Sequence, residues 1–313
     1  MVIFLDCIST NLNNNIRLIF GMPIKYNSYI VRYSEIALKG KNRGNFERKL
    51  IDNIKIQFSD KKIDSIIRPV GRIIIDSNDE LDLRCVMGIS SYSPALKIKH
   101  DGKTDLTELK KVIDLFIERF NKSSKYSNFR VDCQRGNKSY ALTSVDIERT
   151  IGGYIGSNTK KPVKLKNSDY SFIIEIINDS FYVTDEKIKA FSGFPVGVQG
   201  SVLANLDDKY SLLSAWLFLK RGCQIIPFYT KGNHEKELAL LQKYSPKKLI
   251  LNKINDENDL LELSRKYKTR SIVSPTTIET LDKYKKHEDY YELMPLILMD
   301  ENDIKDKIKE ISR

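Results

Sequence analysis

The sequence predicts a multidomain protein in which two α+β units precede an α/β domain with a parallel sheet. In the first 190 residues, the predicted strands and helices follow an irregular order, whereas from residue 196 they alternate regularly. A Gly/Pro-rich connection at residues 192–197 separates these two regions. With 313 residues, 41% of them hydrophobic and 30% charged, the chain can form several domains that each bury a core.

The first unit is expected at residues 22–90. Residues 29–33 are rich in β-branched and aromatic side chains and predict a strand. Residues 45–58 predict a helix, because Phe46, Leu50, Ile54 and Phe58 recur every four residues. Strands at 63–67 and 72–75, a short helix at 79–86 and a strand at 91–98 complete a ferredoxin-like order. Residues 1–21 are expected to be a flexible extension or to follow from a mis-assigned start codon.

The second unit is expected at residues 91–191. Residues 105–120 predict an amphipathic helix, 128–134 a strand, and 144–155 a second helix with Ser144 as its N-cap. Further strands are expected at 162–165, 172–177 and 180–188. This order predicts a sheet-based domain with a basic face.

The third unit, at residues 196–313, is expected to be Rossmann-like. It opens with a short buried strand from Ser201, a tight turn and an apolar helix that ends at Gly222. Strands at 224–229, 248–251 and 271–273 then alternate with helices at 235–244 and 256–268. Such alternation is typical of a parallel sheet that helices cover on both faces.

The net charge of +11 is unevenly distributed. Residues 22–195 hold 31 Lys and Arg against 22 Asp and Glu, whereas residues 196–313 hold 20 against 18. A basic excess in the first two thirds is explained equally by a polyanionic partner, most simply nucleic acid, and by a merely solubilising surface. The candidate RNA-binding residues are Lys39, Lys41, Asn42 and Arg43 ahead of the first helix, and Arg130, Arg135, Lys138, Lys164 and Lys166 in the second unit. A solvated loop and a solvated strand edge are the plainer alternatives.

The cysteines and histidines indicate no metal site. Cys7, Cys85, Cys133 and Cys223 are scattered without a CxxC pair, so free thiols in a reducing cytoplasm are expected. The three histidines are isolated and lack metal-ligand spacing. No run reaches the roughly 18 apolar residues of a membrane-spanning helix, so a cytoplasmic protein is expected.

Several segments resemble the tRNA 4-thiouridine synthetases, or tRNA sulfurtransferases. RYSEIALKGKNRGNFERKL resembles the N-terminal ferredoxin-like segment of that family, and MGISSYSPAL resembles its entry into the THUMP domain. RGNKSYALTSVDIERTIGGYI and KIKAFSGFPVGVQGSVL resemble the rest of that domain and the link to the catalytic part. The resemblance implies a THUMP RNA-binding domain at residues 91–191, a PP-loop ATPase fold at 196–313, and tRNA bound near its acceptor end.

The turn after the strand at Ser201 departs from that family. The family carries a Ser-Gly-Gly-x-Asp-Ser turn that binds ATP, and alignment from the helix end places Leu206 on the first Ser and Ser211 on the last. Asp207 and Asp208 then replace the glycines and Tyr210 replaces the Asp. Carboxylates there oppose a bound phosphate, with each contact at ~4 Å costing roughly 1–4 kcal/mol. One of the two Asp residues is expected to cap the helix instead.

These departures predict a noncatalytic tRNA-binding relative with a degenerate PP-loop domain. The chain also has no cysteine after Cys223, where the family's sulfur-handling residue is expected, so no catalytic residue and no cofactor are assigned. Two alternatives stay open: an active ATP-dependent tRNA sulfurtransferase making 4-thiouridine with help from a partner, for which ATP and Mg²⁺ would be needed; and a noncatalytic assembly protein. A protein partner is expected at the C-terminal domain.

Overall fold

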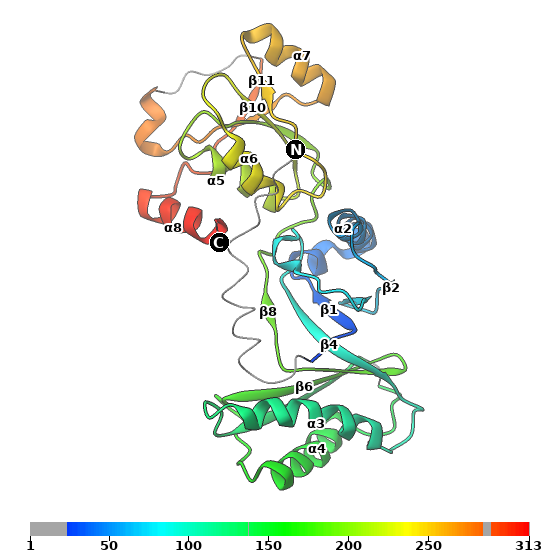
Figure 1. The fold of residues 1–313 in the computed structure, drawn as a ribbon. Helices are drawn as coiled ribbons and strands as arrows, with labels where there is room; N and C mark the ends of the chain where they lie inside the picture. Colours follow the sequence, from blue (N-terminus) through cyan, green and yellow to red (C-terminus); the bar gives the residue numbers. More distant parts are fainter. Residues whose placement is uncertain (1–23, 137, 284–288, 313) are drawn as a thin grey trace, which may run out of the picture. The chain divides into compact units, whose positions relative to one another are not determined.

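The computed structural model describes residues 24–136, 138–283 and 289–312, which form two compact units (Figure 1). The first unit contains the described residues up to Val31 together with Lys62–Glu80 and Tyr92–Ile188. The second contains Arg32–Lys61, Leu81–Ser91 and the described residues from Lys189 onward. No helix in these ranges is long and apolar enough to cross a membrane. The expectation for residues 1–21 lies outside the described ranges, as does Cys7.

The first unit is built on one continuous eight-stranded sheet with the order β2-β3-β1-β4-β7-β6-β5, and β8 also pairs with β4. Its strands are β1 (Ser28–Arg32), β2 (Ser65–Ile67), β3 (Ile73–Asp76), β4 (Ser91–Lys99), β5 (Phe129–Arg135), β6 (Tyr170–Ile177), β7 (Ser180–Thr184) and β8 (Ile188–Lys189). The strands expected in the ferredoxin-like unit therefore share a sheet with those of the following unit. β5 and β6 run parallel, whereas β6 and β7 form an antiparallel hairpin.

Helices α3 (Thr107–Lys122) and α4 (Ser144–Thr159) cover the β5-β6 end of this sheet (Figure 1). In β5 and β6, alternate residues point into the core, and Phe129 and Phe172 are fully buried there. Phe120 of α3 reaches both rings, with centroid distances of 5.8 and 5.7 Å. The apolar stripe of the predicted helix at 105–120 is therefore confirmed as the surface that packs on the sheet.

Two expectations for this unit are wrong in detail. The N-cap of α4 is Thr143 rather than Ser144, and Thr143 and Asp146 form a reciprocal capping box. Residues 162–165 do not form a strand, because only Val163 bridges, to Phe129, and Pro162 has no backbone N–H to donate to a ladder.

The second unit contains a five-stranded parallel sheet in the order β11-β10-β9-β12-β13. The strands are β9 (Ser201–Asn205), β10 (Gln224–Tyr229), β11 (Asn252–Lys253), β12 (Ser271–Val273) and β13 (Tyr291–Leu293). Counted along the chain this order is 3-2-1-4-5, as in doubly wound dinucleotide-binding folds. The expected Rossmann-like architecture is confirmed, although the strand expected at 248–251 begins only at Asn252.

Helices cover both faces of the parallel sheet. One core contains Ala204 and Ile225 with α5 (Ser211–Lys220), α6 (Glu235–Gln242) and α8 (Glu301–Ile311). The other contains Leu203 and Ile226 with α7 (Glu257–Tyr267). Neighbouring residues of β9 thus enter opposite cores, which explains why this strand reads as a continuous apolar run.

The second unit also holds α2 (Arg43–Gln57) and two short 3-10 segments, η1 (Glu35–Asn42) and η2 (Leu83–Cys85). The loop expected at residues 39–44 is therefore mostly 3-10 helix, broken at Gly40 with a φ of +50°. The helix expected at 79–86 is reduced to η2. Leu81 and Leu83 are both buried, and residues two positions apart do not share one face of an α-helix.

The Gly/Pro-rich connection at residues 192–197 packs tightly against the end of α5. The Phe194 N–H donates to the Lys220 carbonyl at 2.9 Å, and Asn53 of α2 donates to the Val196 carbonyl at 3.1 Å. Gly193 has a φ of +85°, and a Cβ there would lie 2.2 Å from the Lys220 carbonyl oxygen. This position accommodates only glycine without movement of the backbone.

Candidate functional site

The predicted strand–turn–helix corner is present, formed by β9, the turn at 206–210 and α5. Leu206 is buried in the core beneath the turn, so its backbone is fixed at the carboxyl end of β9. Ser211 begins α5, and its hydroxyl accepts a hydrogen bond from the Asp208 N–H at 3.2 Å. The Asp208 carboxylate accepts from the Tyr210 N–H at 2.8 Å. The Tyr210 hydroxyl donates to Glu301 of α8 at 3.0 Å.

Asp207 contacts the loop that follows the neighbouring strand, β10. Its carboxylate accepts hydrogen bonds from the Thr230 N–H at 3.0 and 3.1 Å, the Thr230 hydroxyl at 2.6 Å and the Lys231 N–H at 3.3 Å. The ring nitrogen Nε2 of His234 lies 3.4 Å away. Burial by itself raises the pKa of Asp207. The hydrogen bonds from Thr230 and Lys231 and the proximity of His234 lower it by more than burial raises it, so the pKa lies below its usual value.

The expectation that Asp207 or Asp208 caps α5 is wrong. The N-cap of α5 is Tyr210, and no side chain accepts a hydrogen bond in the capping geometry. Asp207 instead joins two parallel strand ends, and Asp208 closes a turn with Tyr210. Backbone N–H groups at the carboxyl ends of parallel strands are well placed to bind an external anion. Here the carboxylate of Asp207 accepts hydrogen bonds from these N–H groups instead.

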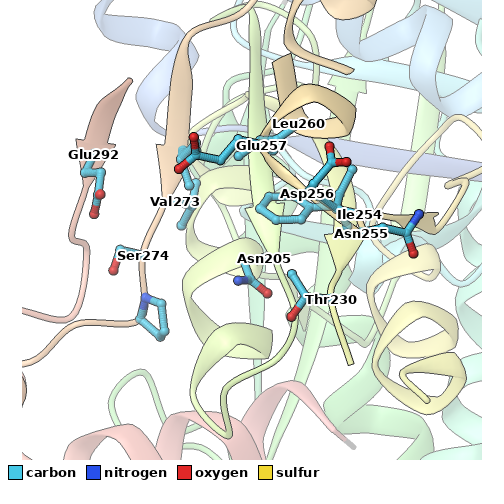
Figure 2. A pocket seen from close by; sticks show the side chains of 13 residues that line it. Asn205, Thr230, Ile254, Asn255, Asp256, Glu257, Leu260, Val273, Ser274 and Glu292 are labelled. Carbon is cyan, nitrogen blue, oxygen red and sulfur yellow. The ribbon is translucent and has the colours of Figure 1, made fainter. Parts of the chain in front are cut away.

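A pocket of about 330 Å³ lies beside this corner, at the carboxyl edge of the parallel sheet (Figure 2). Figure 2 shows thirteen lining residues, which come from the ends of β9, β10, β11 and β12, the start of α7, and Glu292 of β13. The lining residues are Asn205, Phe228, Thr230, Ile254, Asn255, Asp256, Glu257, Leu260, Ile272, Val273, Ser274, Pro275 and Glu292. Three of these are acidic, and none of the thirteen is Lys, Arg or His.

The predicted basic residues at 39–43 lie in the second unit and differ in their surroundings. Lys39 places its Nζ 4.3 Å from the ring centroid of Phe194 and 5.2 Å from that of Phe46. Arg43 is 3.6 Å from Glu47 and remains 39% exposed. Lys41 and Asn42 are exposed at the end of η1, and Asn42 makes no capping hydrogen bond. Lys41 is therefore the most accessible cation of this group.

The other predicted basic residues lie in the first unit. Arg130 of β5 donates to the Ser171 hydroxyl at 2.9 Å and stays 40% exposed. Arg135 is structural, because its Nη1 donates to the carbonyls of Tyr140 and Leu142 at 3.3 and 2.9 Å. Lys138, Lys164 and Lys166 are exposed. Because the two groups belong to separate units, each is a separate candidate surface for RNA.

Sequence reasoning missed Thr230, Lys231 and His234 as part of the corner. The carboxyl ends of adjacent parallel strands meet at one edge of the sheet. A contact between the loop after the second strand and the turn after the first could therefore have been predicted from the sequence. Gly232, with a φ of +83°, is the sequence feature that allows this loop to turn. Among the described residues, no group of three His, Cys, Asp or Glu side chains could hold a metal ion, and Cys85, Cys133 and Cys223 are free thiols.

Two family models match segments of this chain, and two solved structures align with most of it. Residues 28–93 match the ThiI ferredoxin-like domain, and residues 103–185 match the THUMP domain. A crystal structure of PH1313 from Pyrococcus horikoshii aligns with a TM-score of 0.80 and 28% identity over 92% of this chain and 100% of that chain. A 4-thiouridine synthetase in a complex with RNA and bound ATP aligns with a TM-score of 0.75 and 24% identity, over 91% and 85% of the two chains.

Curated relatives match between about two thirds and nine tenths of this chain. The "Probable tRNA sulfurtransferase" of Natranaerobius thermophilus is 32% identical over 214 residues, which are 64% of this chain and 51% of that protein. The protein of the same name from Brevibacillus brevis is 27% identical over 337 residues, covering 92% and 83%. The chain thus spans about half the length of several curated relatives that it matches.

The chain is therefore a THUMP-domain protein in which a ferredoxin-like segment precedes, and a Rossmann-like parallel sheet follows, the THUMP domain. It belongs to the ThiI family. The resemblance seen in the sequence is confirmed.

Proposed function

We propose that this protein is a tRNA-binding member of the ThiI family that does not itself adenylate or thiolate its RNA. The RNA contacts are assigned to the ferredoxin-like and THUMP regions, with proposed boundaries at 22–90 and 91–191, and residues 196–313 form a scaffold and protein-partner surface. The observation that carries the proposal is the carboxylate of Asp207, which already accepts hydrogen bonds from the Thr230 and Lys231 N–H groups.

The residues of this corner do not fit ATP. A triphosphate needs free N–H donors and cations, but Asp207 occupies two of these donors and the adjacent pocket presents three carboxylates. Repulsion between a carboxylate and a phosphate at ~4 Å amounts to roughly 1–4 kcal/mol. Two or three such contacts would weaken binding by several orders of magnitude. No step of the proposed function therefore passes through ATP or Mg²⁺.

Support for tRNA as the partner comes from the charge of the chain and from its similarity to known proteins. Residues 22–195 carry 31 Lys and Arg against 22 Asp and Glu, and Lys41, Lys138, Lys164 and Lys166 are exposed. The related synthetase was solved with RNA, and the curated relatives are named tRNA sulfurtransferases. Structured RNA is held largely through its shape and backbone, which such separate basic surfaces suit.

An ATP–pyrophosphate exchange assay with the full chain and tRNA tests the proposal. We expect tRNA to bind and exchange to stay at the level of a protein-free blank. The double change Asp207→Gly and Asp208→Gly should leave tRNA affinity unchanged, because that corner carries no RNA contact. Robust tRNA-dependent exchange by the unchanged protein would overturn the proposal.

One observation favours an active enzyme as the second candidate. The parallel sheet keeps the 3-2-1-4-5 order with a pocket at its carboxyl edge, the place where nucleotides bind in such folds. In that case a partner subunit would supply the missing cations and thiol. Assay of 4-thiouridine in tRNA from cells lacking this chain separates the two: loss of 4-thiouridine supports the enzyme. An assembly protein, the third candidate, is supported only if tRNA shows no affinity at low salt.

A further inference from the structure

Two helices of the second unit place lysine side chains against the connection at residues 192–197. The stem of Lys220, the last residue of α5, lies against Gly193, where an added Cβ would be 2.8 Å from the Lys220 Cγ. Lys49 of α2 lies against Gly197, where an added Cβ would be 2.9 Å from the Lys49 Cε and 3.2 Å from its Nζ. Gly197 is exposed, and both lysines are half-buried. The two glycines thus leave the space that the lysine side chains occupy.

A third lysine is held beside the same connection by aromatic rings. The Nζ of Lys39 lies 4.3 Å from the ring centroid of Phe194 and 5.2 Å from that of Phe46, and the two rings pack edge to face. The Phe194 N–H donates to the Lys220 carbonyl at 2.9 Å, which ties these rings to the end of α5. Both rings are partly exposed, and Arg221, directly after Lys220, is exposed. Cations interleaved with accessible aromatic rings are typical of nucleic-acid-binding surfaces.

The positive charge of this surface is not neutralised by ion pairs. Among the residues that the structure describes, no carboxylate forms an ion pair with any of the four cations, which are Lys39, Lys49, Lys220 and Arg221. Glu35 attracts Lys220, but its carboxylate already accepts the Gly193 N–H at 3.1 Å and the Ser34 hydroxyl. The surface therefore keeps a positive charge that an external anion can neutralise.

Lys220 is also repelled by a neighbouring lysine. The Nζ atoms of Lys220 and of Lys307 in α8 lie 5.5 and 5.8 Å from the ring centroid of Trp216. Burial and the charge of Lys307 lower the pKa of Lys220 below its usual value, although Glu35 and Glu310 attract it. A phosphate bound beside Lys220 would oppose this repulsion.

We propose that the connection and the C-terminal end of α5 form a further binding surface for the phosphate backbone of tRNA, through Lys49, Lys220 and Arg221. The partly exposed rings beside Lys39 offer a stacking surface for an unpaired base, which an acidic protein partner would not use. The inference rests on the proposed tRNA binding and extends the RNA contacts beyond residue 191 into the Rossmann-like part of the chain.

A triple variant of the full chain tests the inference, with Lys49→Gln, Lys220→Gln and Arg221→Gln. Gel shifts with a tRNA transcript from about 50 to 200 mM salt give the slope of log affinity against log salt. We expect the magnitude of the slope to fall by about two to three, because each phosphate contact contributes about 0.7–0.9.

The matched control changes three exposed lysines of the same unit to Gln, namely Lys236, Lys247 and Lys248. It removes the same charge and should change the slope by less than about one. Lys220→Arg keeps the charge and should keep the slope, which separates a phosphate contact from packing of the lysine stem against Gly193.

Thermal unfolding followed by circular dichroism accompanies each titration, because cations at the end of a helix also stabilise the helix. If the triple variant does not fold, the double change Lys49→Gln and Arg221→Gln replaces it, since it leaves the Lys220 stem in place. The double variant should lower the magnitude of the slope by about one to two.

Two kinds of failure are distinguishable. An unchanged slope in the folded variant, or an equal loss in the variant and the lysine control, would overturn this inference and leave tRNA binding by the other basic groups intact. If the unchanged protein has no affinity for tRNA at low salt, the proposed function is wrong and this inference is wrong with it.

Discussion

At the scale of single residues, the side-chain carboxylate of Asp207 takes the place that an external anion would occupy. Its carboxylate side chain is only 12% exposed and accepts hydrogen bonds from Thr230 and Lys231. A glycine at this position would leave those N–H groups to solvent or to a ligand. Asp207 thus stabilises the corner and opposes phosphate binding through the same contacts.

Replacing Asp207 with Ala should destabilise the second unit by about 1.5–3 kcal/mol, the usual range for hydrogen bonds to a charged group. Urea denaturation at pH 7, followed by circular dichroism, measures this loss. Asp208→Ala is the control, and its cost should be smaller because the Asp208 carboxylate accepts a hydrogen bond from the Tyr210 N–H, whereas the Asp207 carboxylate accepts from two N–H groups and a hydroxyl. Equal costs for the two variants would contradict the special role of Asp207.

The pH dependence of Asp207 has a definite sign. Burial opposes ionisation, but the hydrogen bonds from Thr230 and Lys231 prevail and lower the pKa below its unfolded value of about 3.9. Its contribution to stability is therefore complete above about pH 4–5 and is lost as the pH falls through the folded pKa. The stability gap between the unchanged protein and Asp207→Ala should shrink as denaturation is repeated from pH 5 towards pH 2. A gap that is constant over this range would exclude an ionised Asp207 as its cause.

Residue-level contacts were the least predictable part of the site. Asp207 and Asp208 are adjacent and chemically identical, and the sequence offers no means of telling which one faces Thr230, 23 positions away. Similarly, Thr143 and Ser144 are both good N-caps, and the start of the helix decides between them. Arg135 was expected to face RNA, whereas it binds two carbonyls of its own loop, which only the tertiary structure reveals.

At the scale of elements, helix α4 owes its first turn to the capping box of Thr143 and Asp146. The Asp146 N–H donates to the Thr143 hydroxyl at 3.2 Å, and the Thr143 N–H donates to the Asp146 carboxylate at 3.0 Å. These contacts satisfy donors that the helix cannot pair internally. Because α4 covers β5, its start also fixes the position of Ile147 and Ile151 in the core.

Thr143→Ala should lower the free energy of unfolding by about 1 kcal/mol, the typical cost of removing an N-cap side chain. Ser144→Ala, one position further along, is the control and should cost less. Thermal unfolding of both variants, monitored by circular dichroism, decides between them. A larger loss for Ser144→Ala would restore Ser144 as the functional cap.

Elements were predictable wherever periodicity was strong. The strands at 224–229 and 271–273 have the predicted bounds, because continuous apolar runs flanked by polar residues leave little choice. The failures are short segments in which tertiary contacts outweigh local preference. Val163 and Leu165 suggested a strand, yet they are 52% and 76% exposed, and Val163 forms a single bridge.

At the scale of the whole molecule, the separate basic groups should be measurable as separate contributions to RNA binding. Each Lys or Arg that neutralises a phosphate adds about 0.7–0.9 to the slope of log affinity against log salt. Lys41 is exposed, whereas Lys39 lies against two aromatic rings and Arg43 beside Glu47. Their contributions should therefore differ.

Changing Lys39, Lys41 and Arg43 together to Ala should reduce tRNA affinity and lower the salt slope by up to about three phosphate units. Lys41→Ala alone should account for about one of them. The control replaces Lys236, Lys247 and Lys248, three exposed lysines of the same unit, and should change the slope less. Gel shifts over a salt series measure both. If the control and the triple variant behave alike, residues 39–43 form only a solvated segment.

The continuous sheet of the first unit has a consequence for synthesis of the chain. Strands β1, β2, β3 and β4 are complete once residue 99 has left the ribosome, but β4 pairs on its other side with β7 at residues 180–184. At about 5–20 residues per second, the gap lasts roughly 4–17 s. During that interval β4 is an unpaired edge open to association with other nascent chains. We therefore expect the fraction of this protein that aggregates in growing cells to be lowest when translation between these two strands is fast or when a chaperone covers the β4 edge.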